Sequence, residues 1–508
     1  MKDYYFNEES DMDKFHDDMS TNSDLDKAHD ECGVFGIYLN NTDNSNPDKP
    51  HIDVATYCHT ALCALQHRGQ DSCGIVINDG GVFEYHKGLG LVAENFKQRT
   101  LDRLRGGKIG IGHVRYSPKG QNVPHNVQPM VARHLKGPMA IEFNGSLVNS
   151  QELREKYELE GKIFRSTGDV EIFAYAITEF RLKYPSIQLA LEQAMHKLKG
   201  AYSLVIMSAR KLIAARDPHG LRPLCIGKIG DAAWVVASES CALNSIGAEF
   251  VRDVRPGEII VVKDNELTSI DTHCTENTGY KSSMCVFEYI YIARPDSMVE
   301  GVSVHSARVR AGELLASEEK VDADIVIGVP DSGIDAALGY SRRSGIEYGI
   351  GLIRNRYSER TFIQPTQNER INAVRIKLSP LSASVKGKRV VLVDDSIVRG
   401  TTTGVITELL REAGATEVHV RISAPPFIYP CHFGIDIPDR ECLVACQMTH
   451  EEIKASINAD SLGFLSLENV ARIVPDVKCG LCDGCFSGKY PMDVPEQLQR
   501  DNKYSNKL

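Results

Sequence analysis

The residues best suited to chemistry lie in one stretch of the sequence, 388–403, which reads KRVVLVDDSIVRGTTT. Its apolar residues 390–393 predict a buried strand that ends in two carboxylates, Asp394 and Asp395. A loop with Gly400 and three threonines follows, and then a helix with apolar residues at i, i+3 and i+4 spacing. Free N–H groups at the start of a helix, together with threonine hydroxyls, suit phosphate oxygens. Paired aspartates suit sugar hydroxyls or a hydrated Mg²⁺, so the stretch predicts a site for a phosphorylated sugar.

The elements around this stretch alternate between strands and helices. Strands are expected over 324–329, 348–353 and 417–422 in addition to 390–393, and a helix is expected to begin at 334–340. Strands that alternate with helices predict a parallel sheet, whose ligands bind at the carboxyl ends of the strands. The aspartate loop lies at such an end.

The sequence of this loop is not a mononucleotide P-loop, because G-x-x-x-x-G-K-[ST] is absent from it. The whole string resembles the phosphoribosylpyrophosphate (PRPP) loop of the type I phosphoribosyltransferases. The resemblance implies that the two aspartates contact the ribose hydroxyls, directly or through a metal, and that the Gly-Thr-Thr end holds the 5′-phosphate. The PRPP-binding residues that it implies are Asp394, Asp395, Ser396, Arg399, Gly400, Thr401 and Thr402. It also implies that Ser332 joins Asp394 and Asp395 at a Mg²⁺ site.

A polar and basic segment, 354–377, precedes the loop. Its composition alone is that of a solvated loop. In the family that it resembles, a loop at this place closes over PRPP, and basic groups suit a pyrophosphate leaving group. The lid residues that this implies are Arg356, Arg360, Gln364 and Lys377.

The first 31 residues differ in character from the rest of the chain. They hold eleven Asp/Glu and three Lys, so they carry −8 of the net charge of −10. Low hydrophobicity and high charge predict a disordered leader. The nearly neutral remainder argues against a general nucleic-acid-binding protein. The leader ends just before Cys32, which begins a strand-like segment.

Several short pieces follow Cys32 in a characteristic order. They are 67–71 (HRGQD), 112–116 (GHVRY), 144–145 (NG) and 168–169 (GD). In this order they resemble the glutamine amidotransferase domain of the N-terminal-nucleophile class, over 32–270. The resemblance implies that 1–31 is a propeptide, whose removal gives Cys32 a free α-amino group. An amine with a pKa near 8 can serve as the base that makes the thiolate.

The remaining glutamine-site residues also follow from this resemblance. Asn144 and Gly145 match the oxyanion hole. Arg115 suits the α-carboxylate of glutamine, since a guanidinium can bind it with two hydrogen bonds, and Asp169 suits the α-ammonium group. Taken alone, Arg115 could belong to a surface ion pair, and Asn144-Gly145 could be an ordinary turn.

A cluster of cysteines near the carboxyl end is typical of metal ligands. Cys479, Cys482 and Cys485 are spaced three residues apart, which fits zinc and an iron–sulfur cluster equally well. The full cysteine pattern resembles the cluster-bearing branch of one family. That resemblance implies a [4Fe-4S] cluster on Cys285, Cys431, Cys482 and Cys485. Cys479 is then left over.

Length and composition set the outer limits. A chain of 508 residues has room for two or three domains, and no run of about 18 apolar residues predicts a membrane span. The acidic start is not a secretory signal, and fourteen cysteines without such a signal predict thiols or metal ligands in a reducing compartment, hence a cytoplasmic protein. The expected organisation is an acidic disordered propeptide (1–31), an α+β N-terminal-nucleophile domain of the αββα type (32–270), an α/β type I phosphoribosyltransferase domain with a parallel sheet and the cluster cysteines (271–490), and a polar tail (491–508).

A glutamine amidotransferase followed by a PRPP-binding domain closely resembles the amidophosphoribosyltransferases, over 32–490. The resemblance implies that glutamine and PRPP are converted to 5-phosphoribosylamine, glutamate and pyrophosphate, the first step of de novo purine biosynthesis. It also implies an internal route for ammonia, inhibition by purine nucleotides and a homotetramer. Two alternatives stay open: another amidotransferase of the same class, acting on a sugar phosphate or aspartate, and a non-catalytic regulator that keeps its leader and senses PRPP or nucleotides.

Overall fold

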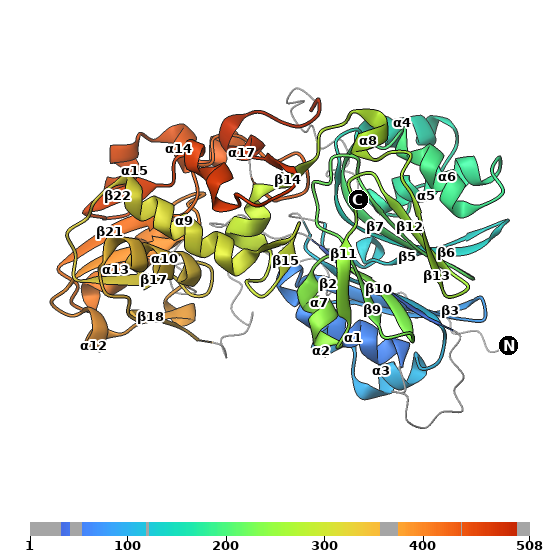
Figure 1. Ribbon diagram of the computed structural model, residues 1–508, viewed down its shortest axis with the longest axis horizontal. Helices are drawn as coiled ribbons and strands as arrows, with labels where there is room; N and C mark the ends of the chain where they lie inside the picture. Colours follow the sequence, from blue (N-terminus) through green and yellow to red (C-terminus); the bar gives the residue numbers. More distant parts are fainter. Residues whose placement is uncertain (1–31, 41–52, 118–120, 356–373, 438, 495–508) are drawn as a thin grey trace, which may run out of the picture.

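The computed structural model describes residues 32–40, 53–117, 121–355, 374–437 and 439–494. Two units lie side by side in it, the first built on two antiparallel sheets and the second on a parallel sheet (Figure 1). The chain enters the second unit near β14 (Ser283–Cys285), since Met284, Val286 and, in β15 (Met298–Val299), Val299 belong to the core of that unit. The predicted order, an α+β unit followed by an α/β unit with a parallel sheet, is therefore confirmed.

The first sheet has seven strands and is centred on β1, the strand that follows Cys32. In order across the sheet, the strands are β11 (Glu249–Asp253), β9 (Cys225–Ile229), β10 (Ala233–Ala237), β1 (Gly33–Leu39), β4 (Ile109–Arg115), β2 (Ser72–Asp79) and β3 (Val82–Leu89). Helices α1 (Val54–Ala64) and α7 (Ser240–Ser245) pack on its outer face. The short helices α2 (Val92–Asn95) and α3 (Gln98–Arg103) follow β3 in the chain.

The second sheet has six strands and faces the first. Its order is β13 (Glu266–Ile270), β12 (Ile259–Lys263), β8 (Leu212–Arg216), β7 (Gly200–Ser208), β6 (Gly137–Leu147) and β5 (Met130–His134). Its outer face carries α4 (Ser150–Leu159), α5 (Val170–Arg181) and α6 (Ile187–Met195).

Alternation along β1 explains why it is buried on both faces. Val34 and Tyr38 point into the apolar layer between the sheets, whereas Phe35 and Ile37 pack under α1. A strand sandwiched in this way holds its first residue in a fixed place.

The second unit contains four parallel strands in the order β17-β20-β21-β22. Their bounds are β17 (Ile325–Gly328), β20 (Arg389–Asp394), β21 (Glu417–Ile422) and β22 (Ser461–Phe464). The main helices around them are α9 (Val304–Glu318), α10 (Ile334–Ser344), α13 (Thr401–Glu412) and α15 (His450–Ser456). Apolar residues of α13 at the predicted spacing are buried against the sheet, and Gly414 has a positive φ of 99° just past the helix end.

The prediction of a strand over 348–353 is largely wrong. Only β18 (Leu352–Arg354) forms there, paired with β19 (Leu378–Pro380), and Tyr348 makes a single bridge to Val326. Gly349 lies so close to β17 that a Cβ atom would approach Ile325 Cδ1 to 2.6 Å. The segment therefore crosses over the sheet as close-packed backbone instead of joining it as a strand.

None of the helices in the described residues has both the length and the apolar composition that crossing a bilayer requires.

The carboxyl of Asp253, a half-buried residue at the end of β11, gives the first testable prediction. Burial raises the pKa of Asp253 to about 7. The nearby Glu300 adds to this effect, whereas Arg216 opposes it. The folded protein thus binds this proton more tightly than the unfolded chain does, and Asp253 lowers stability as pH rises toward 7. Asp253→Asn should therefore raise the melting temperature at pH 8. At about 1.4 kcal/mol per pKa unit, the free energy of unfolding should rise by at most about 4 kcal/mol.

The pH profile of the melting temperature checks this prediction. The advantage of Asp253→Asn should grow between pH 4 and 7 and become constant above that range. An advantage that does not change with pH would contradict a titrating Asp253.

Candidate active sites

The first site lies where the start of β1 is next to the end of β4. Gly33 of β1 pairs with Val114 of β4, so Cys32 and Arg115 come from neighbouring strand ends. Cys32 is half-buried, and its Sγ lies 3.8 Å from the carbonyl oxygen of Tyr116. The sheet register thus brings together the predicted nucleophile and the predicted carboxylate-binding arginine.

Arg115 is a buried cation in this site. Its side chain donates to Ser117 Oγ and, at 3.0 Å, to the carbonyl of Gln121. Burial lowers the pKa of Arg115, while Cys32 and Asp71 nearby act in the opposite direction. A guanidinium stays charged in proteins, so Arg115 presents a positive charge beside the thiol.

Asn144 and Gly145 lie in the middle of a strand, so they do not form the turn that was the alternative interpretation. Both belong to β6 and pair with Ser203 and Tyr202 of β7. Gly145 has a φ of 133°, and a Cβ atom there would lie 2.0 Å from the carbonyl oxygen of Ala201. Only glycine fits this position.

The side chain of Asn144 is fully buried, and neither its Oδ1 nor its Nδ2 has a hydrogen-bond partner among the described residues. A buried amide without partners is costly. Such a group is available to a substrate oxygen, which supports the predicted oxyanion role.

Two contacts hold β6 over the start of β1 and the end of β4. The Glu142 carboxyl accepts from the N–H of Phe35 at 3.2 Å, and His113 Nε2 lies 3.1 Å from the carbonyl of Phe143. Burial raises the pKa of Glu142 well above its usual range and lowers that of His113 to about 3. Both groups are therefore neutral. Sequence reasoning assigned neither a role: Glu142 lies outside the motifs, and in 112–116 only Arg115 received one.

Asp169 comes from a fourth element, immediately before α5. Its Oδ2 accepts a hydrogen bond of 3.0 Å from the N–H of Leu147, the last residue of β6. The carboxylate is thereby fixed near the strand that carries Asn144. The structure thus gathers the predicted glutamine-site residues from β1, β4, β6 and the start of α5.

The second site lies at the carboxyl end of β20, where the sequence predicted it. Asp394 is the last residue of the strand, and the side chains of Asp394, Asp395 and Ser396 are almost fully buried. Asp394 Oδ1 lies 3.5 Å from Ser332 Oγ and accepts from the N–H of Asp395 at 2.9 Å. Ser396 Oγ donates to Asp395 at 2.5 Å. The three predicted Mg²⁺-site residues therefore meet at one edge of the sheet.

The loop after Asp395 turns into α13 at Gly400. This glycine has a φ of 87° and precedes the first helical residue, Thr401. Thr401 and Thr402 are half-buried at the helix start, and the Nε atom of Arg399 is buried without a partner among the described residues. The turn thus presents N–H groups, hydroxyls and a cation in one place.

Comparisons with known proteins place both halves in one family. Residues 113–245 match a glutamine amidotransferase domain, and residues 305–424 match a phosphoribosyl transferase domain. The amidophosphoribosyltransferase of Methanocaldococcus jannaschii is 47% identical over 477 residues, covering 91% of this chain and 98% of the relative. The chain belongs to the amidophosphoribosyltransferase family. The Bacillus subtilis amidophosphoribosyltransferase is 46% identical over 469 residues, covering 91% of this chain and 94% of the relative.

Two solved structures of similar proteins agree with this. One is the glutamine PRPP amidotransferase from B. subtilis complexed with ADP and GMP, with a TM-score of 0.83, 45% identity, and coverage of 92% of this chain and 98% of that chain. The other is described as the allosteric regulatory enzyme of purine biosynthesis, with a TM-score of 0.84, 44% identity, and coverage of 92% and 97%. The amidophosphoribosyltransferase fold therefore extends over both units.

Part of the predicted lid lies outside the described residues: Arg356, Arg360 and Gln364. Lys377 is described, and its carbonyl accepts from the N–H of Asn355 at 2.8 Å, next to the β18–β19 pair. Arg354, the first residue of the segment 354–377, forms an ion pair with Asp331, with its Nη1 2.7 Å from Asp331 Oδ2. The basic lid stays a prediction.

The four predicted cluster cysteines lie close to one another. Cys285 of β14 is paired in parallel with Cys482 of β23 (Gly480–Cys482). Burial raises the pKa of Cys482 to about 12, with Cys431 adding to the effect. Burial also raises the pKa of Cys485 well above its usual range, and the thiols of Cys285, Cys431 and Cys482 reinforce it.

The left-over cysteine, Cys479, has other neighbours. Burial raises the pKa of Cys479 to about 11. Among the nearby charges, Glu300 adds to this effect and Arg216 opposes it. In the described part of the chain, no group of three or more His, Cys, Asp or Glu side chains has the spacing to hold a metal ion. Four neighbouring thiols are, however, the number of ligands that a [4Fe-4S] cluster takes. The donor set therefore fits the cluster.

Proposed function

We propose that this chain transfers the amide nitrogen of glutamine to C1 of PRPP, forming 5-phosphoribosylamine, glutamate and pyrophosphate in the first step of de novo purine biosynthesis. One observation supports this most strongly: a single chain carries the residues predicted for a glutamine site, next to Cys32 and on β6, and a buried Asp394-Asp395 pair that leads into a Gly-Thr-Thr turn. Membership of the amidophosphoribosyltransferase family favours this function over both alternatives.

The glutamine half-reaction would start once residues 1–31 have been removed. The new α-amino group of Cys32 takes the thiol proton, and Sγ attacks the side-chain carbonyl carbon of glutamine. The carbonyl oxygen becomes an oxyanion, which the Asn144 amide and the Gly145 N–H stabilise. The amide nitrogen takes the proton and leaves as ammonia, and water then cleaves the thioester to glutamate. Arg115 and Asp169 hold the α-carboxylate and α-ammonium groups of the substrate.

In the second half-reaction, ammonia attacks C1 of PRPP and pyrophosphate leaves. The turn of Arg399, Gly400, Thr401 and Thr402 would hold the 5′-phosphate, with Ser396 beside it. Asp394 and Asp395 would hold the ribose hydroxyls and, with Ser332, a hydrated Mg²⁺, which supplies positive charge to the pyrophosphate. Mg²⁺ sites of this kind use one or two carboxylates and keep several waters. The lid residues Arg356, Arg360, Gln364 and Lys377 would close over the site and exclude water.

We propose that ammonia moves between the sites inside the protein. In water near neutral pH ammonia is mostly protonated, and ammonium has no lone pair with which to attack C1. A protected route keeps the nitrogen nucleophilic.

The [4Fe-4S] cluster would be held by Cys285, Cys431, Cys482 and Cys485, and it would be structural, because neither half-reaction transfers electrons. These cysteines come from β14, from the loop after β21 and from the carboxyl-terminal segment. A cluster on them would tie that segment to the rest of the chain. Iron analysis and absorbance in the visible range test this proposal.

Purine nucleotides are proposed as inhibitors. The similar B. subtilis structure contains ADP and GMP, and a nucleotide phosphate suits the same turn as the 5′-phosphate of PRPP. We also propose a homotetramer in the cytoplasm. Inhibition assays with AMP, ADP and GMP, and sedimentation of the purified protein, test these two points.

The test of the function uses the purified full-length chain with glutamine, PRPP and Mg²⁺. Glutamate and pyrophosphate should form in equal amounts, and omission of PRPP or Mg²⁺ should stop pyrophosphate release. Amino-terminal sequencing should give Cys32 as the first residue of active protein. Active protein that begins at Met1 would contradict the role of the α-amino group.

Gly400 offers a test of the phosphate turn. Gly400→Ala has room for the methyl group, since the nearest atom lies 3.6 Å from it, but the φ of 87° disfavours any other residue. Alanine in a left-handed conformation costs roughly 1–2 kcal/mol, so KM for PRPP should rise about tenfold. Glutamine hydrolysis should not change.

Gly404→Ala is the matched control for Gly400→Ala. Gly404 lies one turn further along α13, has no positive φ, and leaves 3.6 Å of space for a Cβ atom. Its replacement should leave KM for PRPP unchanged. Equal effects of the two substitutions would show that the turn is not what holds the substrate.

A further inference from the structure

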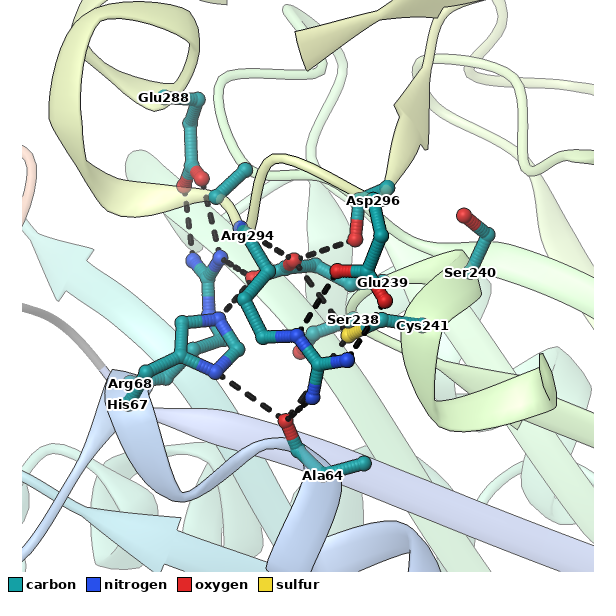
Figure 2. Close-up of polar contacts among 12 residues, drawn as sticks. Ala64, His67, Arg68, Ser238, Glu239, Ser240, Cys241, Glu288, Arg294 and Asp296 are labelled. Carbon is teal, nitrogen blue, oxygen red and sulfur yellow. Dashed lines mark hydrogen bonds and ion pairs between the residues drawn. The ribbon is translucent and has the colours of Figure 1, made fainter. Parts of the chain in front are cut away.

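A buried cluster of charges joins the two units of the molecule. Arg68 lies in the short helix η2 (Gln66–Arg68), and its side chain has no exposed surface. Its Nη1 lies 2.6 Å from Glu239 Oε1, just before α7, and its Nη2 lies 2.7 Å from Glu288 Oε1 in the second unit. Both carboxylates are also fully buried, and Figure 2 shows their contacts with Arg68. One guanidinium therefore holds a carboxylate from each unit.

The same guanidinium reaches the start of β1. Arg68 Nε donates to the carbonyl oxygen of Cys32 at 3.1 Å. A guanidinium is a rigid, planar fork, so its contacts move together. A change in the position of Glu288 must then change the position of the Cys32 backbone, or else break a hydrogen bond between buried groups.

The second unit fixes Glu288 firmly. Glu288 is the first residue of a five-residue π-helix, η4 (Glu288–Ile292). Arg308 of α9 holds this segment by donating to the carbonyls of Tyr289, Tyr291 and Ala293 at 2.9, 2.6 and 2.7 Å. Helices of this kind are rare and often mark functional sites.

Further contacts surround Glu288 and Glu239. Arg222 Nη1 lies 3.6 Å from Glu288 Oε1, and its guanidinium also donates to the carbonyl of Phe433. Glu239 accepts from Ser297 Oγ at 2.7 Å and from the N–H of Arg294 at 2.9 Å, both in the second unit. Glu239 thus accepts hydrogen bonds from both units: from Arg68 in the first and from Ser297 and Arg294 in the second.

We propose that Glu288 is a positioning residue for the glutamine reaction: acting through Arg68, this carboxylate of the second unit holds Cys32 in its reactive orientation. The inference rests on the proposed role of Cys32 as the nucleophile. It means that the glutamine site is complete only when the phosphoribosyltransferase unit is in place. Apolar side chains could join two units at less desolvation cost than buried charges, whereas rigid, directional contacts are what the placement of a nucleophile needs.

The test compares two ion pairs that cross the same boundary, one fully buried and one with a carboxylate that is partly exposed. Glu288→Gln weakens the pair that leads to Cys32. Glu300→Gln is the matched control, because Glu300 pairs at 2.5 Å with Arg216, whose other bonds go to the carbonyls of Gly220, Arg222 and Val254 and to Met284 Sδ. Each full-length protein is first checked for Cys32 as its amino-terminal residue. Then kcat and KM for glutamine hydrolysis, the ammonia-dependent reaction, the rate of Cys32 alkylation by iodoacetamide and the melting temperature are measured.

Glu288→Gln should lower kcat for glutamine hydrolysis at least about tenfold with little change in KM, because a displacement of about 1 Å in a reacting group can cost up to 10²-fold. Alkylation of Cys32 should slow as well, while the ammonia-dependent reaction is retained. Glu300→Gln should lower only the melting temperature. The proposal is overturned if Glu288→Gln keeps the kcat of the parent protein, or if Glu300→Gln loses as much kcat as Glu288→Gln.

A second pair of variants covers the case in which loss of the charge prevents folding. Glu288→Asp and Glu300→Asp keep both charges and shorten each side chain by one methylene. Glu288→Asp should again lower kcat selectively, and equal kcat values in these two variants would overturn the proposal. A parent protein that does not hydrolyse glutamine would instead contradict the proposed function itself.

Discussion

Replacing Cys32 with alanine is expected to abolish glutamine-dependent formation of phosphoribosylamine and to leave ammonia-dependent formation intact. Removal of a catalytic nucleophile lowers kcat by at least about 10⁴-fold, and Cys32 is the thiol that acts on the pKa of Arg115. The second site contributes its own residues at β20 and α13, far along the chain from Cys32. Pyrophosphate release measured with glutamine and then with ammonium chloride at alkaline pH separates the two activities.

The control for Cys32→Ala is Cys63→Ala, which removes an exposed thiol of α1. This variant should keep both activities. If Cys32→Ala lost the ammonia-dependent reaction as well, the division of labour between two sites would be wrong. If it kept the glutamine-dependent reaction, another group would have to be the nucleophile.

The parts of the fold that could be predicted from sequence are those with a local cause. The strand before Asp394, the turn at Gly400 and the helix after them all form as their patterns indicated, although the helix already begins at Thr401 and so includes the threonines expected in the loop. The segment 348–353 has the composition of a strand, yet tertiary contact decides its state: its glycines let the backbone pass close over β17. The short strand β22 was not predicted at all, since four residues that include Gly463 give little signal.

The candidate sites divide in the same way. Residues within motifs, such as Asn144-Gly145 and Asp394-Asp395, could be singled out from sequence. Glu239 and Glu288 could not, because they lie 171 and 220 positions from Arg68, and charged residues are expected at the surface unless a partner is known. Only the three-dimensional structure shows that these charges neutralise one another.

Replacing Asn144 should lower the activity without lowering the stability. Asn144→Ala is expected to lower kcat for glutamine hydrolysis by about 10²–10³-fold, the usual effect of losing one oxyanion-hole donor, with little change in KM. The melting temperature should stay the same or rise, because both polar atoms of this side chain are buried without partners in the described residues. Steady-state kinetics and thermal unfolding of the same preparations measure the two effects.

Asn78→Ala is the matched control, since Asn78 is a buried asparagine of β2 whose amide is satisfied. Its Nδ2 donates to the carbonyl of Ser208 at 3.1 Å, and its Oδ1 accepts from the N–H of Gly81 at 2.8 Å. This variant should lose about 2–4 °C in melting temperature and keep its kcat. An asparagine kept for structure would behave like Asn78 in both measurements. Asn144 should behave in the opposite way, because its unpaired amide destabilises the folded protein and becomes useful only when the oxyanion forms.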